Sequence, residues 1–181
     1  MKSVTIAMLL IAGFGYGNAR ASLEVKGMQG ALANQADASI DAVKRKAEAL
    51  VRFLETKKDK RVEKVVLNKY NWAGVPAEEL VNYNIKIGET KYTVERPGKA
   101  KPDAHYLGLN VRGPRGATEI ILWDREMDGR LDQAMDVKNT TKEEKKLYGT
   151  KGYELKDRER WQAEYERTID ALSQYLGVTA P

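Results

Sequence analysis

The chain has 181 residues, 42% of them hydrophobic and 31% charged, with a formal net charge of +5 and no cysteine. Its length suits one domain with a sizeable core, and the lack of cysteine excludes disulfides and every cysteine-based site. The positive excess is small and acids alternate with bases along the chain, so we expect no nucleic-acid partner.

The first 21 residues are predicted to be a secretory signal peptide. Lys2 precedes an apolar run over Val4–Ala12, and Ala19-Arg20-Ala21 supplies a small-x-small cleavage site before Ser22. The apolar run is too short to span a bilayer, and an uncleaved N-terminal anchor is the alternative. Cleavage lowers the formal net charge from +5 to +3, because residues 1–21 contain two bases and no acid. We therefore expect an exported protein, periplasmic or secreted, with no stable membrane insertion, whose single domain covers residues 22–181.

A long helix is predicted over residues 29–58. One narrow apolar stripe recurs at steps of three and four residues along it, at Ala33, Ala36, Ile40, Val43, Ala47, Leu50 and Leu54. The stripe suits a helix packed on its own domain, and a helix that pairs with a second chain is the alternative. The charged residues 57–64 fit a solvated helix end. For residues 65–67, periodicity does not distinguish a short strand from a last helical turn.

Five strands are predicted after this helix. Residues 80–87 and 90–95 alternate apolar and polar positions around Gly88-Glu89, which is typical of a hairpin. Residues 96–103 form a proline-bearing loop, and residues 105–111, 117–123 and 131–138 are the remaining strands. Residues 112–116 make a tight turn between two of these strands.

Two helices close the chain. A short helix over residues 140–147 has Thr140 or Thr141 as its cap, with Glu143 or Glu144 behind it. A long helix follows over residues 157–176 and stops at Gly177. The order helix, antiparallel meander, helix predicts an α+β fold in two layers, with the long helices packed on one face of the sheet.

The chain lacks the residues that most catalytic mechanisms require. Beyond residue 21 the chain has one histidine, His105, and three serines, Ser22, Ser39 and Ser173. This inventory argues against a serine triad and against zinc sites built on several His or Cys ligands. The sequence also contains no phosphate-binding glycine loop. Carboxylate catalysis remains open because Asp and Glu are plentiful, although no pair stands out.

The segment from Asp124 to Met135 has the spacing of a calcium loop. Asp124, Glu126, Asp128 and Asp132 stand at positions one, three, five and nine, and Arg130 offers its backbone carbonyl at position seven. With Gly129 at position six, the stretch resembles the Asp-x-Asp-x-Asp-Gly loops of EF-hands and dockerins. The resemblance covers about a dozen residues and implies bound calcium. It departs at Glu126 and at position twelve, where Met135 replaces the bidentate acid.

A metal-free hairpin explains the same residues. Asp128-Gly129 is a favoured pair for a two-residue turn. That turn places Leu122 opposite Met135, Ile120 opposite Val137 and Trp123 opposite Ala134, with Arg125 facing Asp132. Both interpretations stay open at this point.

Three functions fit the sequence. The leading hypothesis is a non-enzymatic binding protein with an unknown protein or polysaccharide partner, using helical stripes or aromatics such as Tyr70, Trp72 and Trp161, with calcium as the one candidate cofactor. The first alternative is a carboxylate enzyme that acts on cell-wall or matrix polysaccharide and needs two acids in one cleft. The second is a periplasmic assembly or chaperone-like factor.

Overall fold

The structure is a computed structural model that describes residues 18–72, 75–98, 105–114, 116–148, 150 and 152–180, without the side chains of residues 18–36 and 68–79. The chain divides into two compact units, residues 1–38 and residues 39–181. The first unit contains the N-terminal part of one long helix, and the second contains the rest of that helix, the sheet and the remaining helices. Among the described residues, no helix is long and apolar enough to cross a membrane. The predicted signal peptide and the start of the mature domain at Ser22 stay predictions.

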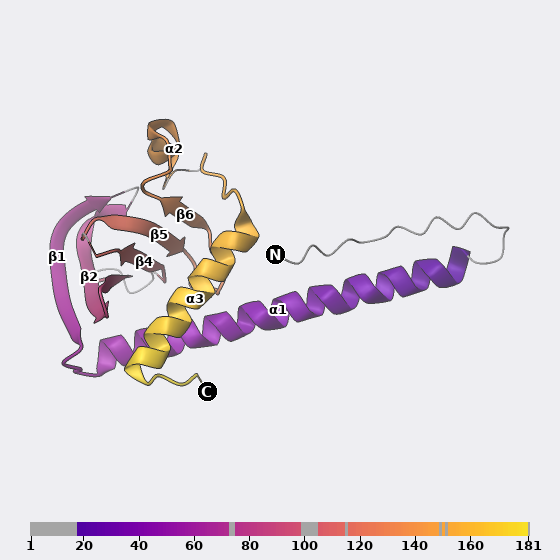
Figure 1. Ribbon diagram of the computed structural model, residues 1–181, viewed down its shortest axis with the longest axis horizontal. Coiled ribbons are helices and arrows are strands. Elements are labelled where there is room, and N and C mark those ends of the chain that lie inside the picture. The colour runs from indigo at the N-terminus through magenta and orange to yellow at the C-terminus, as the bar shows by residue number, and fades with distance from the viewer. Residues whose placement is uncertain are drawn as a thin grey trace. The chain divides into compact units, whose positions relative to one another are not determined.

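Six strands form one antiparallel sheet in which each strand pairs with the next along the chain (Figure 1). The strands are β1 (Val62–Trp72), β2 (Val75–Ile87), β3 (Thr90–Pro97), β4 (Leu107–Arg112), β5 (Thr118–Asp124) and β6 (Gln133–Asp136). The helices are α1 (Asn18–Thr56), α2 (Lys142–Leu147) and α3 (Arg158–Leu176). The predicted α+β class, with its meander and its two long helices, is confirmed.

Several secondary-structure elements differ in their boundaries from the predicted ones. The residues that periodicity left undecided, 65–67, lie within β1, which adds a sixth strand to the predicted five. The hairpin around Gly88 is confirmed, and Ile87 pairs with Thr90. The short helix is capped by Thr141 and Glu144, which bond each other's backbone as a capping box. Gly177 ends α3 with a φ of 71°, as predicted.

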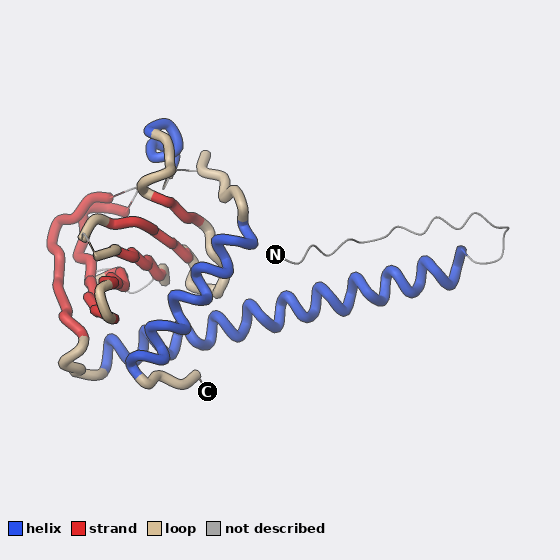
Figure 2. The backbone as a smooth tube through the Cα atoms, in the orientation of Figure 1, coloured by secondary structure: helices blue, strands red, loops and turns tan. Residues whose placement is uncertain are grey.

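The main core lies between one face of the sheet and the helices, and we call this the helix face (Figure 2). The pairing register aligns one row of apolar residues across it: Tyr83, Val94, Leu109, Leu122 and Ala134. The apolar stripe of α1 and the stripe of α3 bury Ala47, Leu50 and Leu54 together with Tyr165, Ile169 and Leu172 in the same core. An ion pair of 2.7 Å between Lys46 Nζ and Asp170 Oδ1 also joins the two helices. This part of α1 therefore packs on its own domain.

The opposite face of the sheet carries a second, aromatic cluster. Its buried members are Leu80, Tyr106, Trp123, Met135 and Tyr148. The Tyr106 and Trp123 rings meet edge to face with centroids 5.8 Å apart, and Tyr148 stacks on Trp123 at 6.3 Å. Because both faces of the sheet are covered here, central strands place buried residues at consecutive positions instead of alternating cleanly.

The predicted register between the last two strands is wrong by one residue. Trp123 pairs with Gln133, Leu122 with Ala134 and Ile121 with Met135, whereas the two-residue turn predicted Leu122 opposite Met135. A shift of one residue moves each side chain to the other face. The observed register keeps Leu122 and Ala134 in the main core and places Met135 in the aromatic cluster.

The connection between β5 and β6 is a loop that packs tightly against α1. Gly129, at its tip, has a φ of 88°, and a Cβ there would lie 2.6 Å from the Ile40 carbonyl oxygen and 2.9 Å from the Lys44 amide nitrogen. Met127 also adopts the left-handed region, with a φ of 52°. Glycine is therefore required at position 129 by its backbone conformation and by the approach of α1.

We expect Gly129→Ala to lower the free energy of unfolding by about 2–4 kcal/mol, because the methyl group meets the α1 backbone in addition to the cost of a positive φ. Gly88→Ala is the matched control, since Gly88 also has a positive φ of 59° but no atom within 4 Å of the added Cβ. The control should cost about 1–2 kcal/mol. Urea denaturation measures both values, and equal losses would contradict the close packing of the loop on α1.

Candidate functional site

The Asp124 carboxylate organises the loop that was predicted to bind calcium. Asp124 ends β5 and is fully buried on the helix face. Its Oδ1 accepts a hydrogen bond of 3.1 Å from the Asp128 amide, and its Oδ2 accepts bonds of 3.0 Å from the Gly129 amide and 2.8 Å from the Tyr165 hydroxyl. Burial raises the pKa of Asp124 to about 6, although these three hydrogen bonds favour the ionised form.

Other carboxylates of the segment hold nearby amides. Asp128 Oδ1 accepts a bond of 2.8 Å from the Arg130 amide, and Asp132 Oδ2 accepts one of 2.7 Å from the Arg125 amide. Arg125 and Asp132 therefore meet through a backbone amide and a carboxylate, whereas the predicted cross-strand pairing of the two residues belongs to the register that is wrong by one. These bonds explain the register error, because the carboxylates close a wider loop than the Asp128-Gly129 turn.

Side chains of α3 form hydrogen bonds with the other side of the loop. Gln162 Oε1 accepts the Leu131 amide at 2.9 Å, and Gln162 Nε2 donates to the Gly129 carbonyl at 2.8 Å. Arg158 Nη1 donates to the Leu131 carbonyl at 3.0 Å. The loop is thus fixed by α3 on one side and by the close approach of α1 on the other.

The predicted calcium ligands differ in their exposure to solvent. Asp124 is buried, Glu126 and Asp128 are exposed, Arg130 has an exposed side chain, and Asp132 is half-buried. Burial and the neighbouring Asp132 raise the pKa of Glu126. In the described part of the chain, no group of three or more His, Cys, Asp or Glu side chains is arranged to hold a metal ion. Calcium binding thus remains one of the two interpretations that the sequence allows for this loop.

We expect millimolar calcium to leave the melting temperature unchanged, because Asp124, Asp128 and Asp132 already accept hydrogen bonds from loop amides. A ligand that binds only the folded state must raise the melting temperature, so a thermal scan with and without calcium is a direct measurement. A rise that Asp132→Asn abolishes would support the calcium loop instead.

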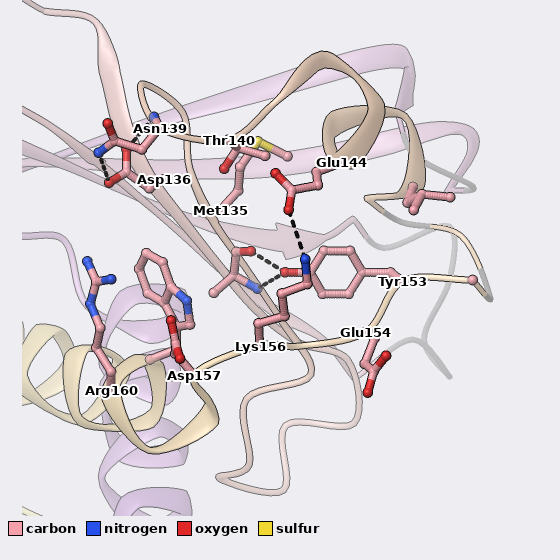
Figure 3. Close-up of a pocket in the computed structure, with 14 residues that line it drawn as sticks. Met135, Asp136, Asn139, Thr140, Glu144, Tyr153, Glu154, Lys156, Asp157 and Arg160 are labelled. Atoms are coloured by element: carbon pink, nitrogen blue, oxygen red, sulfur yellow. Dashed lines mark hydrogen bonds and ion pairs between the residues drawn. The ribbon is translucent and has the colours of Figure 1, made fainter.

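A pocket of about 560 Å³ lies between β6, α2 and the start of α3 (Figure 3). Its apolar lining consists of Ala134, Met135, Leu147, Tyr153 and Trp161. The Tyr153 hydroxyl donates to the Ala134 carbonyl and also accepts from the Ala134 amide at 3.2 Å, which fixes this aromatic ring beside β6. The size falls within the usual range for sites that bind small molecules or peptide side chains.

Charged side chains surround this pocket. Lys156 Nζ and Glu144 Oε1 form an ion pair of 3.1 Å between the segment before α3 and α2. On the other side of the view in Figure 3, Asn139 donates to Asp136 Oδ2 at 2.7 Å. The Arg160 guanidinium lies over the Trp161 ring, 4.8 Å from its centroid. Side chains of both charge signs thus accompany the aromatic lining.

Of the aromatics predicted as contact residues, only Trp161 has a described side chain. It is buried and lines the pocket. The side chains of Tyr70 and Trp72 lie outside the described residues. His105 is exposed and precedes β4.

No pair of acids could be singled out for carboxylate catalysis from the sequence, and the structure identifies two buried acids. Burial raises the pKa of Glu95 to about 7 and that of Asp124 to about 6. Glu95 faces the aromatic cluster because its neighbour Val94 faces the main core, whereas Asp124 contacts Tyr165 of α3. The two carboxyl groups are therefore on opposite faces of the sheet, which does not match the single cleft that a glycosidase pair requires.

Comparison with protein-family models, with curated proteins and with solved structures finds no match for this chain.

Proposed function

We propose that this protein is a non-enzymatic binding protein that takes a peptide segment of a partner protein into the pocket between β6, α2 and α3. The observation that carries the proposal is the pocket itself, about 560 Å³ in volume with an apolar floor and a charged rim. An apolar side chain of a partner can occupy such a floor while its neighbours pair with the rim.

The chemistry of the rim favours a peptide over a sugar. Sugars commonly stack on a free aromatic face, but the guanidinium of Arg160 lies over the Trp161 ring. The lining contains both acids and bases, namely Asp136, Glu144, Glu154 and Asp157 with Lys156 and Arg160. Both signs of charge are useful for a peptide with its own charged side chains and backbone amides.

The pocket is also well placed to change on binding. Helix α2 has no buried residue, and its Leu147 is 47% exposed beside the pocket. The ion pair between Glu144 and Lys156 is largely solvent-exposed, so it is a weak restraint. A partner that covers Leu147 gains apolar contact at little cost.

We expect peptides selected from a phage-displayed random library on the wild-type protein to lose at least about tenfold in affinity for Gly152→Trp. Gly152 lines the pocket and its position has a normal backbone, so an indole there fills the site. Gln174→Trp, at an exposed position of α3 outside the pocket, is the control and should bind normally. Fluorescence anisotropy measures each affinity.

Peptides that bind Gly152→Trp as tightly as the wild type would contradict the proposal, as would a library that yields no specific binder. Soluble cell-wall oligosaccharides provide a second arm. Oligosaccharide binding that Gly152→Trp abolishes, without any peptide binding, would also overturn the peptide proposal.

A further inference from the structure

A row of directly paired residues, three of them polar, crosses the face of the sheet that carries the aromatic cluster. The register pairs Asn82 with Glu95, Glu95 with Gly108, Gly108 with Trp123 and Trp123 with Gln133. Directly paired residues of antiparallel strands project on the same face. Each member therefore lies beside the next, across five strands from β2 to β6.

Gly108 gives Glu95 its position. A Cβ at Gly108 would lie 3.2 Å from Glu95 Cβ and 3.6 Å from Glu95 Oε1. The Glu95 side chain thus lies over the bare backbone of β4 and fills the space that any other residue at 108 would occupy. Tyr106 stands two residues before Gly108, and the negative charge of Glu95 adds to burial in raising the pKa of Tyr106.

Two acceptors beside Glu95 are buried without hydrogen-bond partners in the described part of the chain. Glu95 itself is only 7% exposed. The two acceptors are the Tyr106 hydroxyl and the Asn82 side-chain oxygen. Buried polar groups are nearly always satisfied, and leaving one unsatisfied costs about 1–3 kcal/mol, so these two acceptors beside the Glu95 carboxyl favour a ligand that donates hydrogen bonds.

A ligand bound beside these groups must donate hydrogen bonds, since Glu95 and the Asn82 oxygen are acceptors and the Tyr106 oxygen accepts as well. A primary ammonium group has three donors and no acceptor. It also carries the charge that an ionised buried carboxylate needs, and aromatic rings next to it favour a cation. We propose that Asn82, Glu95 and Tyr106 form a binding site for the primary ammonium group of a small amine.

The cationic side chains near the aromatic cluster make other contacts. Arg96 points to the helix face, where it donates to Glu55 at 3.4 Å and to the Tyr106 carbonyl. Arg125 lies over the Trp123 ring, 5.1 Å from its centroid. The other titratable groups among the described residues of this cluster are the phenols of Tyr106, Tyr148 and Tyr153, and burial raises the pKa of all three. Burial also raises the pKa of Glu95 to about 7, so the carboxyl is ionised at pH 8.

Thermal unfolding at pH 8 with methylammonium chloride tests the site. We expect saturating methylammonium to raise the melting temperature by about 2–4 °C over equal concentrations of sodium chloride, because it binds only the folded protein. Tetramethylammonium chloride has the same charge but no donor and should give no such rise. Equal effects of the two ammonium salts, or no rise with methylammonium, would overturn the proposal.

Matched variants test whether methylammonium binds at this site. Glu95→Gln keeps the shape of the side chain and should weaken methylammonium binding at least about tenfold, whereas Glu89→Gln changes the same charge at an exposed turn and should not. Tyr106→Phe removes one acceptor and keeps the ring, so it should also weaken binding. An undiminished response in both Glu95→Gln and Tyr106→Phe would place the ammonium elsewhere and overturn the site.

Discussion

The buried carboxylate of Asp124 is the group on which the arrangement of this domain depends. It ends β5, holds two amides of the following loop and accepts the hydroxyl of Tyr165 from α3. The same loop brings Gly129 against the backbone of α1. One side chain therefore ties a strand, a loop and α3 together, and the loop carries the connection to α1. Because burial disfavours its charge, the site is stable only while all three hydrogen bonds are kept.

The position of α3 has consequences for the proposed pocket. Gln162 and Arg158 fasten the start of α3 to the loop, and Arg160 and Trp161, between them in sequence, line the pocket beside β6. In the observed register between β5 and β6, Met135 pairs with Ile121 and Ala134 with Leu122, and both β6 residues line the same pocket. The loop that resembles a calcium site thus serves as the support that sets the geometry of the pocket walls.

Local patterns in the sequence predicted the hairpin around Gly88, the capping box of α2 and the apolar stripe of α1, because those signals come from neighbouring residues. They failed at the Asp128-Gly129 turn, where local preference favours two residues and the contact of Asp124 with Tyr165, 41 positions away, imposes a wider loop. Glu95 was also missed as a site residue. A glycine within the strand at 108 was its one sequence signal, and its meaning depends on which residue pairs with it.

A double-mutant cycle between Asp124 and Tyr165 is the most direct test of the central role of this contact. Urea denaturation would give the free energies of unfolding for Asp124→Asn, Tyr165→Phe and the double variant. If the buried hydroxyl and carboxylate act as one unit, their coupling energy should be about 1–3 kcal/mol. Losses that add within about 0.5 kcal/mol would mean that the two groups act independently and would contradict the account.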